Sequence, residues 1–203
     1  MLDYNTTLIL FGRSPFINEI KDDIPKLIEK YHTMGCNYFV DTFPEVEYCI
    51  FYDDIVPKVT NKTKIITNIR HFKEPRKKSQ KLCIAHQQQA EFYEIITHQR
   101  TQFSNKVGRL HFYLHTPSMA LNWAWQKGFK TVVIAGIDLT LAHPQHFDCD
   151  HTPDQDSFTL KDSTVMNSRW HLENTASKYL KLYQLNPKST MNLEKISMEE
   201  LLK

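Results

Sequence analysis

The feature that most constrains this fold is a run near the middle of the chain. Residues 131–138 read TVVIAGID, a nearly unbroken apolar stretch that ends on a glycine and an aspartate. Such continuity is typical of a strand buried on both faces of a parallel sheet. Ligands of open α/β sheets bind outside the carboxyl ends of the strands. Asp138 is therefore placed where we expect a binding site.

A matching unit opens the chain. Residues 7–11, TLILF, are followed by Gly12, Arg13 and Ser14 and then by an amphipathic segment from 16 to 31. A strand, a glycine turn and the start of a helix direct backbone N–H groups at a phosphate. A tight connection with no ligand is the alternative for one glycine alone. Two such strand ends in one chain favour a nucleotide-type ligand.

Strand and helix patterns alternate along the whole chain. We expect strands at 7–11, 33–36, 47–52, 64–69, 82–85, 109–114, 131–136 and 182–185. We expect helices at 16–31, 87–101, 117–127, 167–181 and 197–202. This alternation predicts an α/β fold, a single Rossmann-like domain over 1–203 with a doubly wound, mostly parallel sheet. The polar segment 139–166 is predicted to be a long lid loop, because loops of that length are usually functional.

Composition indicates an ordinary soluble globule, with 41% hydrophobic and 24% charged residues. No apolar run approaches the roughly 18–20 residues of a membrane span, so we expect no transmembrane segment. The first residues lack a basic region and do not resemble a secretory signal. Four scattered cysteines without a C-x-x-C pair are predicted to be reduced thiols. Together these observations predict a cytoplasmic protein; the oligomeric state stays open.

The net charge of +2 conceals a strongly basic segment. Residues 58–81 contain nine basic residues and one acid, Glu74, for a segment charge of +8. A solvated loop and a surface for phosphate-rich partners explain this charge about equally well. On the second interpretation, the polyanion-binding residues are Arg70, Lys73, Arg76, Lys77 and Lys78.

Short motifs follow one another in the order seen in a known family. They are LILFGRSP at 8–15, CNYF at 36–39, CIFYD at 49–53, GFK at 128–130, AGID at 135–138, HLENT at 171–175 and LYQLNPKS at 182–189. With these motifs the chain resembles bacterial lipooligosaccharide sialyltransferases and the uncharacterised proteins related to them. That wider group also includes proteins similar to 6-hydroxymethylpterin pyrophosphokinase.

The resemblance implies a nucleotide-sugar donor and His171 as the general base that removes the acceptor hydroxyl proton. Histidine suits this task because its unperturbed pKa lies near working pH. The residues expected to bind the donor are Gly12, Arg13, Ser14, Asn37, Asp53, Ser118, Asp138, Thr140 and His146. Without the resemblance, a surface or capping role would be favoured for His171.

Several positions depart from the family pattern. Arg13 and Asp53 stand where the family has asparagines. The tyrosines that stabilise the leaving phosphate in the sialyltransferases fall near Thr140 and His146. The donor therefore need not carry a sialic acid.

Potential metal ligands are dense between 143 and 151. Asp148 and Asp150 form a D-x-D pattern, which in metal-dependent glycosyltransferases holds a divalent ion against a diphosphate. The resemblance argues against a metal, and the spacing fits no standard zinc site. We therefore expect no metal and no other cofactor, with a divalent ion at Asp148 and Asp150 as the less favoured alternative.

These observations predict an inverting, nucleotide-sugar-dependent glycosyltransferase. Its acceptor is either a surface glycan, as the resemblance implies, or a hydroxyl-bearing modified base in DNA, as the basic segment suggests. Two alternatives remain: a pyrophosphokinase-like enzyme that uses ATP, and a non-catalytic protein that binds nucleotides or nucleic acid. No Walker A P-loop or G-x-S-x-G motif occurs.

Overall fold

The computed structural model describes residues 2–97, 100–139 and 162–203. Within these ranges the strands form one sheet in the order β6-β5-β4-β3-β2-β1-β7-β8-β9, and every neighbouring pair is parallel. The predicted α/β, Rossmann-like fold is confirmed. The strands are β1 (Thr7–Phe11), β2 (His32–Cys36), β3 (Tyr48–Phe51), β4 (Lys64–Asn68), β5 (Ala90–Thr97), β6 (Arg109–Phe112), β7 (Thr131–Ala135), β8 (Lys181–Gln184) and β9 (Glu194–Lys195).

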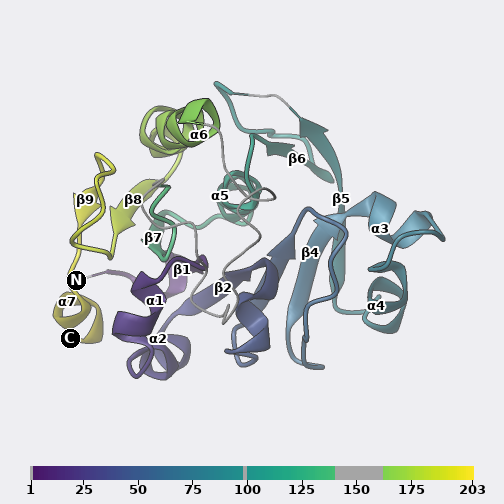
Figure 1. The fold of residues 1–203 in the computed structure, drawn as a ribbon, viewed down its shortest axis with the longest axis horizontal. Helices are drawn as coiled ribbons and strands as arrows, with labels where there is room; N and C mark the ends of the chain where they lie inside the picture. Colours follow the sequence, from purple (N-terminus) through teal and green to yellow (C-terminus); the bar gives the residue numbers. More distant parts are fainter. Residues whose placement is uncertain (1, 98–99, 140–161) are drawn as a thin grey trace.

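Helices connect the strands and cover both faces of the sheet. The α-helices are α1 (Phe16–Ile20), α2 (Ile24–Lys30), α3 (Ile69–Lys73), α4 (Gln80–Ala85), α5 (Thr116–Gln126), α6 (Asp162–Asn174) and α7 (Met198–Leu202). Three short 3-10 helices, η1 (Tyr4–Thr6), η2 (Asn37–Asp41) and η3 (Ala176–Lys178), lie beside strand ends. In Figure 1, α5 and α6 lie on one side of the central strands, and α1, α2 and α7 lie on the other.

The core is divided between the two faces of the sheet, as strand geometry requires. Leu8 and Leu10 of β1 belong to the apolar cluster under α5 and α6, whereas Ile9 and Phe11 belong to the cluster under α1, α2 and α7. Successive side chains of a strand point to opposite faces, so a central strand covered on both faces must be apolar throughout. This explains why the unbroken apolar runs identified the central strands.

The chain reverses its winding direction between β1 and β7. Strands β2 to β6 follow β1 on one side, whereas β7, β8 and β9 lie on the other. The two strand ends approach closely, because the Gly12 N–H donates to the Ala135 carbonyl at 2.8 Å. A Cβ on Gly12 would lie 2.3 Å from the Gly136 carbonyl oxygen, so only glycine fits there. Such a switch point is where doubly wound sheets bind ligands.

Two predicted elements beside β4 are wrong. The strand expected at 82–85 belongs to α4, and the helix expected at 87–101 contains β5 instead. The glutamines and alanine at 87–90 suggested a helix, but the aromatic and β-branched residues from Phe92 to Thr97 fit a pleated strand better. Pairing with both β4 and β6 decides the outcome, because tertiary contacts override weak local propensity.

Other boundaries also move. The helix expected at 16–31 is divided into α1 and α2, because Pro25 fits the first turn of a helix but not its interior. The helix expected at 167–181 is α6, which starts earlier and ends at Asn174, before η3. The predicted lid loop 139–166 is too long at its end, since 162–166 belong to α6. Residues 140–161 lie outside the described residues. Strand β9 was not predicted.

Two further features bear on the protein class. Among the described residues, no helix combines the length and apolar character that crossing a membrane requires. Cys36, Cys49 and Cys83 are buried free thiols, as predicted for the cysteines within the described ranges.

The packing at the switch point leads to a stability prediction. Gly12→Ala should lower the free energy of unfolding by about 3 kcal/mol, because the new methyl group overlaps backbone atoms that cannot move aside. Gly108→Ala is the matched control. Its φ of +77° is strained for alanine, but its Cβ meets nothing within 4 Å, so we expect a loss of about 1 kcal/mol. Urea denaturation measures both values. A smaller loss for Gly12→Ala than for Gly108→Ala would contradict this account.

Candidate active site at the carboxyl edge of the sheet

Loops that follow β1, β7 and β8 meet at the switch point through one buried carboxylate. Asp138 accepts a hydrogen bond from the Ser14 hydroxyl at 2.5 Å and another from the Asn186 amide at 2.9 Å. The Ser14 N–H also donates to the Gly136 carbonyl at 2.9 Å. Each carboxylate oxygen of Asp138 is thus engaged, so this residue holds the three loops together. The predicted residues Gly12, Ser14 and Asp138 are brought to one place, and Asn186 joins them.

Asn37 lies at the same edge, directly after β2. Its φ of 55° is left-handed, and its side-chain oxygen accepts a hydrogen bond from the Thr116 hydroxyl at 3.4 Å. Leu114 and Leu139, which follow β6 and β7, also have positive φ, of 66° and 46°. Non-glycine residues rarely adopt this conformation, and such strain concentrates at functional sites. The backbone at this edge is therefore held in unusual geometry at three separate strand ends.

The contact between Asn37 and Thr116 brings the N-terminus of α5 to this edge. His115 caps α5, since its Nδ1 accepts a hydrogen bond from the Ser118 N–H at 3.3 Å. The Ser118 hydroxyl donates to the His115 carbonyl at 2.8 Å and accepts from the Tyr113 N–H at 2.7 Å. Ser118, predicted to bind the donor, is thus buried and committed to the helix start. Thr116 is the residue of this turn that contacts Asn37.

His171 lies on α6 and is only 1% exposed. Its ring stacks on Tyr113 at a centroid distance of 5.4 Å and lies 6.4 Å from the ring of His115. Burial, together with the charges of Arg100 and His111, lowers the pKa of His171 to about 4. A neutral imidazole at pH 7 can accept a proton, which is what a general base requires.

His115 was not among the sequence-predicted site residues. Burial, together with the charge of His171, lowers its pKa to about 3. A signal was present in the sequence, because a hydrogen-bonding residue before Thr116-Pro117-Ser118 is placed to cap a helix whose first turn contains proline. Capping accounts for the hydrogen bond of Nδ1, whereas Nε2 has no hydrogen-bond partner among the described residues.

Unpartnered polar atoms gather around His171. Within the described residues, four buried side-chain atoms lack a hydrogen-bond partner: Thr7 Oγ1, Arg100 Nε, His115 Nε2 and His171 Nδ1. One of these atoms belongs to His171 itself. A second belongs to Arg100, whose charge lowers the pKa of His171, and a third belongs to His115, whose pKa is lowered by the charge of His171. The Arg100 guanidinium stacks on the neighbouring Trp170 at 3.9 Å. Buried polar groups are nearly always paired, so this concentration makes the surroundings of His171 a candidate site.

The remaining predicted donor residues are more peripheral or not described. Arg13 lies over the Tyr38 ring at 5.4 Å, and Asp53 is exposed after β3. Thr140, His146, Asp148 and Asp150 lie outside the described residues. Within the described ranges, no three histidine, cysteine, aspartate or glutamate side chains gather in a metal-binding arrangement.

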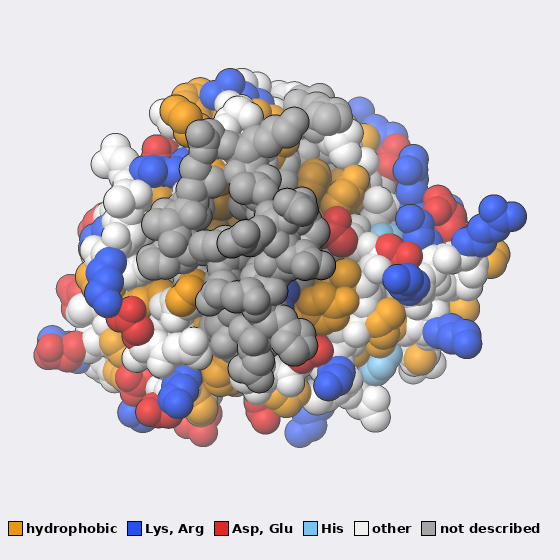
Figure 2. All heavy atoms as spheres, in the orientation of Figure 1, with side chains coloured by type: hydrophobic (Ala, Val, Ile, Leu, Met, Phe, Trp, Pro, Cys, Tyr) orange, Lys and Arg blue, Asp and Glu red, His pale blue; other side chains and the backbone are white. Residues whose placement is uncertain are grey.

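The predicted polyanion-binding residues, which we call the basic cluster, lie on α3 and in the connection to α4. Its members are Arg70, Lys73, Arg76, Lys77 and Lys78, and all but Lys77 are exposed. Glu74 lies 4.0 Å from both Arg70 and Lys77 and offsets part of their charge. Figure 2 shows blue and red side chains interspersed on the α3–α4 side of the molecule. Because α3 follows β4 directly, the basic cluster lies at the carboxyl end of β4.

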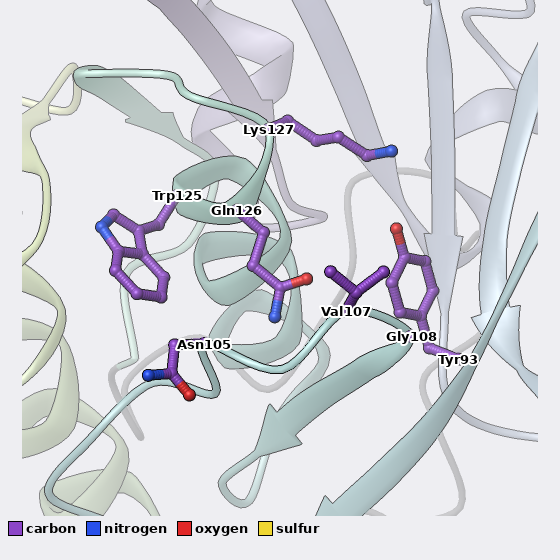
Figure 3. Close-up of a pocket in the computed structure, with 7 residues that line it drawn as sticks. All are labelled: Tyr93, Asn105, Val107, Gly108, Trp125, Gln126 and Lys127. Atoms are coloured by element: carbon purple, nitrogen blue, oxygen red, sulfur yellow. The ribbon is translucent and has the colours of Figure 1, made fainter.

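A separate pocket of about 430 Å³ lies at the amino end of β6. Figure 3 shows Gln126 and Lys127 at the end of α5 beside Tyr93, Val107 and Gly108. None of the predicted site residues lines it. Since α5 begins at the carboxyl edge and ends here, the helix separates this pocket from the candidate site.

No known protein family model, curated protein or solved structure matches this chain.

Proposed function

We propose that this protein is a glycosyltransferase that moves a sugar from a nucleotide-activated donor to an acceptor hydroxyl, with His171 as general base. The observation that carries the proposal is the connection between His171 and the switch-point edge. His171 packs on Tyr113 and lies beside His115. Thr116, which follows His115, contacts Asn37. Asn37 in turn follows β2, the strand next to β1. Resemblance to lipooligosaccharide sialyltransferases supports the same roles.

Donor binding at this edge is supported by the N-terminus of α5, because helix N-termini favour anions. The N–H groups of Gly12, Ser14 and Ser118 are engaged within the protein, so the contribution expected from the backbone is the positive end of the helix dipole. Glycine at position 12 lets the ends of β1 and β7 approach closely, and this approach forms the edge. Asn37 and Thr116 add an amide and a hydroxyl. These groups suit the phosphate and ribose of a nucleotide better than an apolar ligand.

In the proposed reaction, neutral His171 accepts the proton of the acceptor hydroxyl. The hydroxyl oxygen forms a bond to the anomeric carbon, and the bond from that carbon to the donor phosphate oxygen breaks. The nucleotide leaves with the bonding electron pair, and attack from the opposite side inverts the configuration. The negative donor would raise the pKa of His171 from about 4, because an opposite charge favours the protonated form.

The acceptor is either a glycan or a hydroxyl-bearing base in DNA. Resemblance favours the glycan, whereas the exposed basic cluster favours a phosphate-rich polymer. A DNA base would have to be flipped out or presented in a groove for its hydroxyl to reach His171. A pyrophosphokinase-like enzyme would use the same edge for ATP and magnesium. Thermal-shift screening with cytidine, uridine, guanosine and adenosine nucleotides, with and without Mg²⁺, separates these classes.

Replacing the base tests the assignment directly. His171→Ala should lower transfer by about 10²–10⁴-fold and leave nucleotide affinity nearly unchanged, because the base contributes to the transition state. His86→Ala, a histidine at the end of α4, should change neither quantity. Donor binding by calorimetry and product formation with the identified donor measure the two effects. Full turnover by His171→Ala would exclude this residue as the base.

Low pKa values predict an unusual pH dependence. Only unprotonated His171 acts as a base, and its pKa is lowered from 6.5 to about 4. Therefore kcat/KM should stay level as pH falls from 8 to about 5 and decline only toward 4. The pH dependence of kcat should have a higher midpoint, because the bound donor is anionic. A kcat/KM profile that falls by half near pH 6.5 would contradict the buried, neutral histidine.

Charge reversal in the basic cluster tests the acceptor. Lys73→Glu with Arg76→Glu should weaken binding to duplex DNA at least tenfold if phosphate contacts are made there. Lys130→Glu with Lys178→Glu makes the same charge change on exposed lysines elsewhere and should matter less. Wild-type affinity should fall on the order of 10²–10³-fold between 50 and 200 mM salt. Equal effects of the two pairs, or no DNA binding at low salt, would leave the glycan as acceptor.

A further inference from the structure

The hydrogen position on His115 is fixed by its capping role. Its Nδ1 accepts a hydrogen bond from the Ser118 backbone N–H, so Nδ1 cannot carry a hydrogen itself. Neutral His115 must then carry its hydrogen on Nε2. With a pKa of about 3, the ring stays neutral throughout the physiological range. The buried, unpartnered Nε2 is consequently a hydrogen-bond donor.

That donor is directed at α6. The Ser168 backbone raises the pKa of His115, so its carbonyl lies near the ring, although Nε2 has no partner with full hydrogen-bond geometry. Ser168 and His171 are three residues apart and lie on the same helix face. His171 Nδ1 is also buried and unpartnered among the described residues. A fixed donor and an unsatisfied ring nitrogen therefore lie on two neighbouring rings, one at the start of α5 and one on α6.

The distance between the rings is too long for a direct bond. Their centroids are 6.4 Å apart and the ring planes are nearly perpendicular, at 84°. A ring nitrogen lies little more than about 1 Å from its centroid, so the two nitrogens stay beyond the roughly 3.2 Å limit of an N–H hydrogen bond. Polar groups separated in this way are commonly bridged by one water.

We propose that His115 is a positioning residue that fixes the tautomer of His171 through one buried water, leaving Nδ1 as the proton-accepting nitrogen and the hydrogen on Nε2. The water accepts the hydrogen bond from His115 Nε2–H. Its two hydrogens go to His171 Nδ1 and to the Ser168 carbonyl. Three polar partners are what a buried water typically has.

The opposite tautomer of His171 would leave one hydrogen-bonding group unsatisfied. If His171 carried its hydrogen on Nδ1, two N–H donors would face the same water, and one water hydrogen would lack an acceptor among these groups. An unsatisfied buried hydrogen-bonding group costs about 1–3 kcal/mol. Tyr113 and Phe103, which pack on the His171 ring, hold its orientation. The arrangement thus selects one tautomer by hydrogen-bond balance.

This inference rests on the proposed function only for its consequence. If His171 is the base, the proton from the acceptor hydroxyl must reach Nδ1, on the side of His115, and the bridging water lies on that route. The tautomer itself is a property of the protein without substrate. It can therefore be measured whether or not the protein transfers a sugar.

The test is long-range ¹⁵N–¹H correlation NMR on histidine-labelled protein at pH 7. The wild-type protein should show His171 as a single neutral tautomer with the hydrogen on Nε2, assigned from the spectrum of His171→Gln. The midpoint for its protonation should lie well below 6.5. The charges of Arg100 and His111 lower this midpoint, and the titratable rings of Tyr113 and His115 lie beside the His171 ring. A hydrogen on Nδ1, or a mixture of tautomers, would overturn the proposal.

The decisive variant is His115→Ser. Serine retains the cap, because it is a preferred N-cap residue, but its hydroxyl does not reach toward α6 as the imidazole does. His171 should then become a mixture of both tautomers, while the helix cap is retained. His86→Ser is the matched control, since His86 lies at the end of α4 and should leave the tautomer unchanged. An unaltered His171 spectrum in His115→Ser would refute the positioning role.

Activity separates this inference from the proposed function. If both hold, His115→Ser lowers kcat by part of the 10²–10⁴-fold of base catalysis, with little change in KM. If His171→Ala abolishes transfer but His115→Ser leaves the tautomer intact, the base assignment stands and the positioning role fails. If no transfer is found but the tautomer depends on His115, the positioning role stands and the proposed function fails.

Discussion

The site depends on how closely the ends of β1 and β7 approach each other. Two backbone hydrogen bonds join them, from Gly12 to Ala135 at 2.8 Å and from Ser14 to Gly136 at 2.9 Å. No side chain fits at Gly12, and Gly136 has a φ of +70°. Because winding reverses here, the connections leave in opposite directions and expose backbone at the edge. Asp138 then closes the arrangement by bonding loops from both sides.

Burial of His115 and His171 makes the stability of the fold depend on pH in acid. Their pKa values are lowered to about 3 and about 4, whereas both titrate near 6.5 when unfolded. The unfolded chain therefore binds more protons below pH 6.5, and stability falls as pH decreases from 6.5 toward 4. Above 6.5 the two states hold the same charge on these groups, and the full stability is present. The buried pair therefore destabilises the fold in acid and has no such effect above pH 6.5.

Sequence patterns predicted the parallel core well because its signal is local. An unbroken apolar run such as Thr131–Ala135 predicts a strand that is covered on both faces of the sheet. The prediction around β5 was wrong because its signal is not local. The residues of β5 are half-exposed, and pairing with β4 and β6 determines their structure. Sequence position likewise placed Gly12, Asn37 and Asp138 at one edge. The sequence contains a capping signal at His115, but it does not reveal that His115 lies beside His171, because this contact arises from packing between elements more than fifty residues apart.

Helix α5 connects the rigid core with the chemistry at the edge. Its buried Asn122 accepts hydrogen bonds from the Ser104 and His111 N–H groups, at 3.0 and 2.7 Å, and donates to the Ser104 carbonyl at 3.1 Å. The neighbouring Phe103 packs against His171. The side-chain amide of Asn122 thus fixes the segment that contains Phe103, the residue in contact with His171. The N-terminus of the same helix carries His115. The proposed base would require this kind of support, because a base displaced by 1 Å loses much of its effect. Phe103, which packs on the His171 ring, belongs to the hydrophobic core, so the ring is held in place by the same contacts that bury it and lower its pKa.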